Sequence, residues 1–177
     1  MMKYISIKFR NRQWDAQINS GRYSIMFVAV IAKSKGLEKS FIELRGKNFV
    51  TKEKHSWIDL EDIQAEEEVQ IELCEEEKSR NKNSQPEEEQ SQIVQQLSTD
   101  RPSPNYFTVS FNDQMVEGVI KSDANDTIFL LSVKVFDKDE QIEALLFGNA
   151  AHNQDDEGSI SLDIGNARHF TLRFKHK

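Results

Sequence analysis

The side chains that could carry acid–base or nucleophilic chemistry are few in this sequence, and none has a partner at a diagnostic spacing. Histidine occurs as His55, His152, His169 and His176, and Cys74 is the one cysteine. A nucleophilic cysteine needs a base beside it, and zinc needs several Cys or His ligands at short spacing. No glycine-rich phosphate loop and no Gly-x-Ser-x-Gly motif is present. We therefore predict a non-catalytic protein without a cofactor or a metal site.

Three acidic segments could in principle bind a hard cation. They cover residues 123–126, 137–140 and 155–157. Calcium needs six or more oxygen ligands, and a calcium loop has a fixed spacing with an internal glycine and a terminal glutamate. None of the three segments has that spacing, so they are best interpreted as ordinary acidic turns.

Charge is distributed unevenly along the chain. Residues 1–54 carry twelve Lys and Arg against four Asp and Glu, whereas residues 57–77 carry ten acidic residues and no basic one. This pattern predicts an acidic strand edge that attracts a basic protein partner. The alternative is that these carboxylates face the basic residues of the same unit, or water. The candidate partner-binding residues are Glu66, Glu67, Glu68, Glu72, Glu75, Glu76 and Glu77.

Composition limits the classes of partner and the cellular compartments that we expect for this protein. The net charge is −7, which argues against nucleic acid because phosphate binding needs a basic surface. The longest apolar run covers residues 25–32, whereas a membrane-spanning helix needs about 20 apolar residues. Charges interrupt the first ten residues, so no signal peptide is expected. We predict a cytoplasmic protein that does not bind membranes, and a single cysteine fits a reducing compartment.

The elements that must position these side chains follow an internal repeat. Six segments of the first half have counterparts 101–103 residues later, with apolar positions in the same register. Residues 4–9 match residues 106–111, for example, and Gly46 falls on Gly148. We therefore predict a tandem duplication of a β-rich unit of about 70 residues. Two unrelated β-segments of similar length are the alternative.

Alternation of apolar and polar residues predicts that each unit is a set of antiparallel strands. The first segment alternates strictly, and turn residues at 11–12 and 112–113 predict a hairpin into the second strand. Residues 24–32 are continuously apolar, which suits either a central strand covered on both faces or a short buried helix. The fold class is thus mainly β, with α+β as the alternative. The paired Gly46 and Gly148 suggest a backbone conformation that other residues tolerate poorly.

The expected domain organisation follows from the repeat. Unit one covers residues 1–77 and unit two covers residues 105–177, and a unit this small is marginal alone, so we expect the two to pack together. Residues 78–104 are polar and hold all three prolines, which predicts a linker. Within it, residues 86–98 could form a short helix or a disordered tether.

Part of unit one resembles a small bacterial β-rich domain that has no known function. The resemblance rests on Leu44-Arg45-Gly46, on His55-Ser56-Trp57-Ile58-Asp59-Leu60 and on the alternating strand at residues 67–73. It covers residues 44–73 and implies a β-rich fold, but no site residues.

These observations favour a non-catalytic protein-binding module, such as an acidic bacterial immunity protein that blocks a basic toxin. The alternative is a pair of β-domains that binds a small molecule or carbohydrate in a cleft between the units, for which Trp14 or Trp57 would line the pocket. The oligomeric state is left open.

Overall fold

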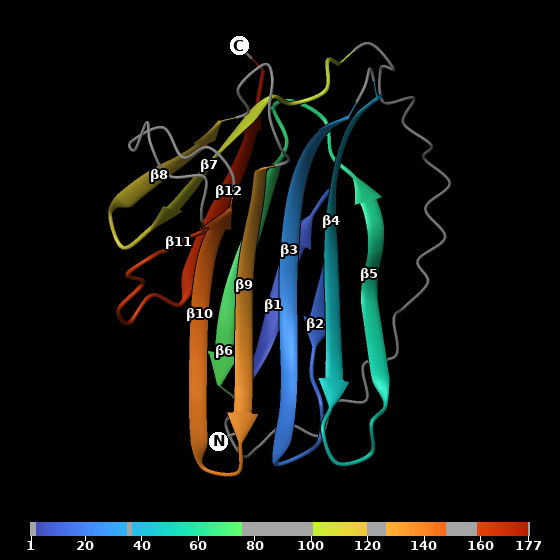
Figure 1. Ribbon diagram of the computed structural model, residues 1–177, viewed down its shortest axis with the longest axis vertical. Coiled ribbons are helices and arrows are strands. Elements are labelled where there is room, and N and C mark those ends of the chain that lie inside the picture. The colour runs from blue at the N-terminus through green and yellow to red at the C-terminus, as the bar shows by residue number, and fades with distance from the viewer. Residues whose placement is uncertain (1–2, 35–36, 76–100, 120–126, 148–158, 177) are drawn as a thin grey trace.

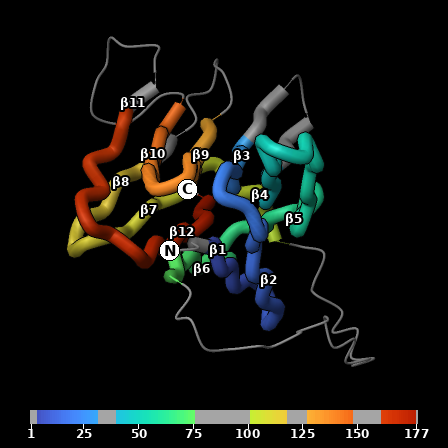
Figure 2. Tube along the Cα trace, turned by 90° about the horizontal axis from the view of Figure 1, so that it is seen from below, coloured from blue at the N-terminus to red at the C-terminus, as the bar shows by residue number. Residues whose placement is uncertain are grey.

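The computed structural model describes residues 3–34, 37–75, 101–119, 127–147 and 159–176, and these residues form an all-β protein. Two antiparallel sheets of six strands lie face to face (Figures 1 and 2). Sheet A has the order β2 (Arg12–Ala16), β1 (Lys3–Phe9), β6 (Glu68–Glu75), β12 (His169–Lys175), β7 (Tyr106–Phe111), β8 (Gln114–Val119). Sheet B has the order β11 (Ser159–Ser161), β10 (Asp139–Phe147), β9 (Thr127–Phe136), β3 (Arg22–Ser34), β4 (Leu37–Asn48), β5 (Lys54–Asp62). The prediction of a mainly β fold is confirmed.

Both sheets are assembled from both halves of the chain. In sheet A, β6 of the first half pairs with β12 of the second, and in sheet B, β3 pairs with β9. Each of these two seams joins strands that the sequence comparison matched to each other, and the strands then follow in the same order outward on either side. This order agrees with the predicted duplication, which itself stays a prediction.

A single core lies between the sheets and crosses the seams. Alternate residues of the central strands point inward, which is the period-two pattern that the sequence carries. Phe27 of β3 and Phe129 of β9 lie with ring centroids 6.5 Å apart. Phe107 of β7 and Phe174 of β12 lie 6.0 Å apart and are fully buried. Full burial of such a ring stabilises a fold by about 1.5–3 kcal/mol. The Phe27–Phe129 contact joins the two halves of the chain, whereas Phe107 and Phe174 both belong to the second half.

Tight turns set the register of the outer hairpins. Arg10 and Asn11 both have positive φ, at 50° and 62°, between β1 and β2. Asn112 and Asp113, at 45° and 60°, occupy the same place between β7 and β8. Positive φ at both central residues is the geometry of two-residue hairpin turns that match the twist of the strands. Both predicted hairpins are therefore present, and the first one turns at residues 10–11 and not at residues 11–12.

The continuously apolar segment at residues 24–32 lies within β3, so the helical alternative for it is wrong. β3 forms ladders with β4 on one side and β9 on the other, and every inward residue from Tyr23 to Ile31 is buried. A helix at this point would leave the edges of both neighbouring strands unpaired.

The reason for glycine at position 46 differs from the expected one. Gly46 does not have a positive φ; instead, a β-carbon there would lie 2.8 Å from the Trp57 ring and 2.9 Å from Ile18. Space, and not backbone conformation, excludes larger residues at this position. Gly148 lies outside the described residues.

The predicted linker is described only at its end. Pro102 accepts a backbone hydrogen bond from Ala65, at 3.2 Å, and Pro104 is buried. These residues therefore belong to the packed structure. The candidate helix at residues 86–98 lies outside the described residues.

Candidate protein-binding surface

The outer face of sheet B is apolar, which is unusual for the solvent side of an antiparallel sheet. It faces the viewer in Figure 1, where β10, β9, β3 and β4 lie in front. On β3 the inward residues are Ile25, Phe27, Ala29 and Ile31, and the residues between them are also largely apolar. On β9 the outward residues Ile128 and Leu130 are apolar as well, and the polar Ser132 and Lys134 follow them. Strands that are apolar on both sides are typical of sheets covered on both faces.

Strand register brings these outward side chains together. Val28 lies directly opposite Leu130, and Leu130 lies opposite Leu145. Val30 lies between Phe41 on one side and Ile128 on the other. Eight residues form this surface, which we call the apolar face: Met26, Val28, Val30, Phe41, Ile128, Leu130, Leu145 and Phe147.

The apolar face is separate from the core between the sheets. None of its eight residues belongs to the buried core cluster or to the partly buried side chains packed on it. Met26 is 37% exposed, and all the others except the buried Val30 are partly exposed. The strand register places these side chains next to one another, and contiguous exposed apolar surface is typical of interaction sites.

Charged residues lie at the margins of the apolar face. On β4, Arg45 contacts Glu43 at 3.2 Å and Asp59 at 3.1 Å. At the opposite margin, Lys134 lies 3.6 Å from Glu143 of β10. All of these side chains except Glu43 are well exposed, so the pairs can exchange partners on binding.

The acidic segment is not on a strand edge. Strand β6 lies in the interior of sheet A, between β1 and β12. Three consecutive glutamates in this segment each meet a different cation: Glu66 contacts Lys175 at 2.7 Å, Glu67 contacts Arg10 at 2.6 Å, and Glu68 contacts Arg173 at 2.8 Å. The alternative stated from the sequence, pairing with basic residues of the same unit, therefore describes Glu67 and Arg10, whereas Glu66 and Glu68 pair with cations of β12 in the other unit.

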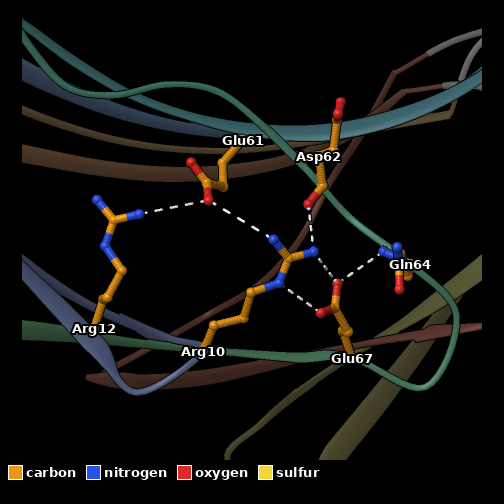
Figure 3. A network of polar contacts seen from close by, with 6 residues as sticks. All are labelled: Arg10, Arg12, Glu61, Asp62, Gln64 and Glu67. Carbon is orange, nitrogen blue, oxygen red and sulfur yellow. Dashed lines mark hydrogen bonds and ion pairs between the residues drawn. The ribbon is translucent and has the colours of Figure 1, made fainter. Parts of the chain in front are cut away.

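The Arg10 contacts form a clamp between the two sheets (Figure 3). The Arg10 guanidinium donates to both carboxylate oxygens of the buried Glu67, at 2.6 and 2.9 Å, and to the backbone oxygen of Asp62. Glu67 also accepts a hydrogen bond from the backbone of Gln64. The hydrogen bond to Glu67 raises the pKa of Arg10. The clamp joins the β1–β2 turn to the end of β5, which is a structural role.

The other candidate glutamates have different positions. Glu72 is half-buried on the outer side of sheet A, where it lines a small hollow with Lys8, Gln70 and His169. Glu75 ends β6, is exposed and has an interaction partner of its own. Glu76 and Glu77 lie outside the described residues. The five candidates that the structure describes therefore do not form one surface.

Cys74 has the properties of an unreactive thiol. Burial raises its pKa. The Tyr4 hydroxyl donates a hydrogen bond to the thiol, which together with burial raises the pKa of Tyr4 to about 12. Because the thiolate is the reactive species, burial does not favour nucleophilic chemistry at Cys74, and the Tyr4 hydrogen bond, which lowers the pKa of the thiol, offsets this only in part.

Histidines and acidic residues do not assemble a metal centre in the part of the chain that the structure describes, where no group of three or more potential ligands occurs. His169 and Glu72 are directly opposite across the seam between β12 and β6. His55 stacks on Trp57, with ring centroids 5.6 Å apart. Trp14 and Trp57 both pack against the core.

Sequence reasoning missed the apolar face although its signal was present. The apolar run at residues 24–32, within β3, indicated a strand covered on both faces as one of its two interpretations. The register needed to place Phe41, Leu145 and Phe147 beside β3 and β9 comes only from the sheet order.

The fold and surface define an antiparallel two-sheet β-protein with an apolar outer sheet face. Comparisons with known protein families, with curated proteins and with solved structures find no match to this chain. In the described residues, no helix has the length and apolar character needed to cross a membrane.

Proposed function

We propose that this chain is a non-catalytic protein-binding module, and that its apolar face receives a β-sheet face of another protein chain. The observation that carries the proposal is the continuity of the apolar face across four strands, centred on Val28 and Leu130. Stacked sheets pack about 10 Å apart through interdigitating apolar side chains, so a sheet face is the partner shape that fits.

Cross-linking at the apolar face tests this proposal. A photoreactive phenylalanine analogue replaces Phe41, and in a control it replaces Thr171 on the outer side of sheet A. We expect a discrete cross-linked product from position 41 and none from position 171, with the product identified by mass spectrometry. Changing both Val28 and Leu130 to threonine should abolish this cross-linked product, because the change places hydroxyl groups in an apolar contact.

A matched control separates loss of the surface from general loss of apolar side chains. Val50 and Met115 are 66% and 63% exposed and lie outside the apolar face. Changing both to threonine should leave the cross-linked product unchanged. Absence of a product at position 41, or equal products from positions 41 and 171, contradicts the proposal.

The narrower version of this proposal is an acidic cytoplasmic antagonist of a basic protein, such as a bacterial immunity protein. It is supported by the net charge of −7. Glu66, Glu67 and Glu68 are used within the chain, so the attraction would come from the overall charge. Charge-steered association slows steeply as salt rises. An association rate with the identified partner that does not change between low and physiological salt contradicts this version.

The small-molecule alternative has one observation in its favour. The hollow beside Glu72 lies at the seam between strands of the two halves and contains charged and hydrogen-bonding groups from Lys8, Gln70 and His169. Neither Trp14 nor Trp57 lines it, so it lacks the aromatic surface expected for a carbohydrate site. We therefore place the protein-binding function first.

A further inference from the structure

We propose that the occupant of the apolar face is a second copy of this chain, packed with its two-fold axis parallel to the strands and above the β3–β9 seam. This inference rests on the proposed protein-binding function and names the partner. It follows from how apolar and charged residues are arranged about the seam.

Residues that lie directly opposite one another across the strands form rows on the outer side of sheet B. The first row is Phe41, Val30, Ile128, Phe147; the second is Glu43, Val28, Leu130, Leu145; the third is Arg45, Met26, Ser132, Glu143. Each row runs from β4 through β3 and β9 to β10, with the seam at its centre. The apolar face is therefore divided by the seam into two flanks of the same strand number.

The proposed axis places β3 against β9 of the second copy and β4 against β10. Each row then meets its own row in the opposite direction. Val28 meets Leu130 of the second copy, and Phe41 meets Phe147. Every apolar residue of the first row faces another apolar residue, and the sheets pack in the aligned manner common to β-sandwiches.

The third row supplies charge complementarity. Arg45 lies at one margin and Glu143 at the other, at equal numbers of strands from the seam, and both side chains are 49% exposed. The proposed axis places Arg45 of each copy opposite Glu143 of the other, so the contact forms twice. In the second row, Glu43 meets Leu145 at the margin, where Arg45 is beside it to neutralise its charge. A face with opposite charges at matched positions on its two flanks is complementary to itself.

The other two-fold axis in the plane of the interface does not give this match. An axis across the strands at the Val28 row places β4 against β4 and Glu43 against Glu43. Moved toward the Arg45 row, it places the apolar first row against the row of Ser24, Lys47 and Lys134. An axis across the strands always leaves β4 against β4, so only the axis along the strands both joins the apolar first row to itself and places Arg45 against Glu143.

Charge reversal of the full-length protein tests the arrangement through three variants: Arg45→Glu, Glu143→Arg and the double variant. Sedimentation velocity over a range of concentrations measures mass against the 20.5 kDa chain. We expect the unchanged protein to be a dimer of twice this mass. Each single variant should raise the dissociation constant by roughly tenfold or more, because two like-charge contacts form per dimer.

Mixing the two single variants is the decisive measurement. In a mixed dimer, the two reversed side chains meet each other at one contact, with opposite charges, and the unchanged Arg45 and Glu143 meet at the other. We expect an equimolar mixture to recover the dimer, and the double variant to recover it alone. Lys138→Glu, at the exposed β9–β10 turn, is the control and should leave the dimer unchanged. Circular dichroism and urea denaturation check that every variant is folded.

Three results would overturn the inference. The first is a monomer at all concentrations, the second is a dimer insensitive to both reversals, and the third is a mixture that fails to recover the dimer. The cross-linking at position 41 separates this failure from failure of the proposed function. A monomer that still cross-links there to a different protein overturns the second copy only, whereas a monomer without any product overturns both.

Discussion

Glycine at position 46 illustrates how a single residue depends on a neighbour in another strand. Its missing β-carbon leaves the space that the Trp57 ring and Ile18 fill. Trp57 in turn stacks against His55. The sequence showed that Gly46 had a counterpart in the repeat. The local sequence pattern could not show that a side chain eleven positions away, Trp57, fills the space beside it.

Gly46→Ala should lower the free energy of unfolding by about 1–3 kcal/mol, because the added methyl group overlaps the Trp57 ring. Urea denaturation measures the change. Gly21→Ala is the matched control, since its β-carbon would have a nearest contact of 3.4 Å and should cost much less. Adding Trp57→Phe should make the Gly46→Ala cost smaller; equal costs in both backgrounds would contradict the steric explanation.

At the residue scale, the sequence shows how many charged residues each segment carries, but it does not show which residues form ion pairs. The imbalance between residues 1–54 and 57–77 suggested internal pairing as one alternative, and Arg10 with Glu67 is such a pair. Arg173 and Lys175 could not be identified as partners of Glu68 and Glu66, because this depends on β12 lying beside β6.

Glu67→Gln should lower the free energy of unfolding by about 2 kcal/mol, because it removes the buried counter-charge of Arg10 while keeping the shape of the side chain, and leaves Arg10 only the longer contact with Glu61 at 3.7 Å. Asp137→Asn makes the same chemical change at an exposed pair with Arg22 and should leave the urea midpoint unchanged. If both variants respond equally, the clamp between the sheets has no special role.

At the scale of elements, local patterns predicted most of the strands and both outer hairpins. Alternation identified β1, β6, β7 and β12, because one side of each faces the core. The order of strands within the sheets could not be predicted, since pairing across the seams joins residues about 100 positions apart. The apolar face depends on that order. The strands that form the face could therefore be predicted from the sequence, but the face itself could not.

The β7–β8 turn offers a test of an element's local preference. Asp113 has φ 60° in a two-residue turn after Asn112, a position where glycine is favoured. Asp113→Gly should therefore raise the free energy of unfolding by about 0.5 kcal/mol. Asp139→Gly, at the exposed start of β10, is the control and should lower it. A loss of stability in both variants would contradict the turn assignment.

At the scale of the whole molecule, the two halves share both sheets and one core. Both seams run through the middle of a sheet, and the core between the sheets contains aromatic residues of both halves. We expected two separate units that pack together. In the structure both units contribute strands to both sheets, so neither unit has a core of its own.

Residues 1–77 and 101–177, expressed as separate chains, should each be insoluble or unfolded. Co-expressed with different tags, they should purify together in equal amounts, because β6–β12 and β3–β9 pairing restores both sheets. Tandem affinity purification and circular dichroism measure this. A folded, monomeric fragment of residues 1–77 alone would show that the seams are dispensable.

The position of β12 in sheet A affects how the protein can fold during its synthesis. β12 follows every other strand in the chain, yet it fills the gap between β6 and β7. While a ribosome is still producing the chain, both neighbours have open edges and Phe107 lacks its cover. Open strand edges recruit other chains. This protein should therefore depend on chaperones, or on slow translation at low temperature, more than a β-protein whose strands pair in the order of synthesis.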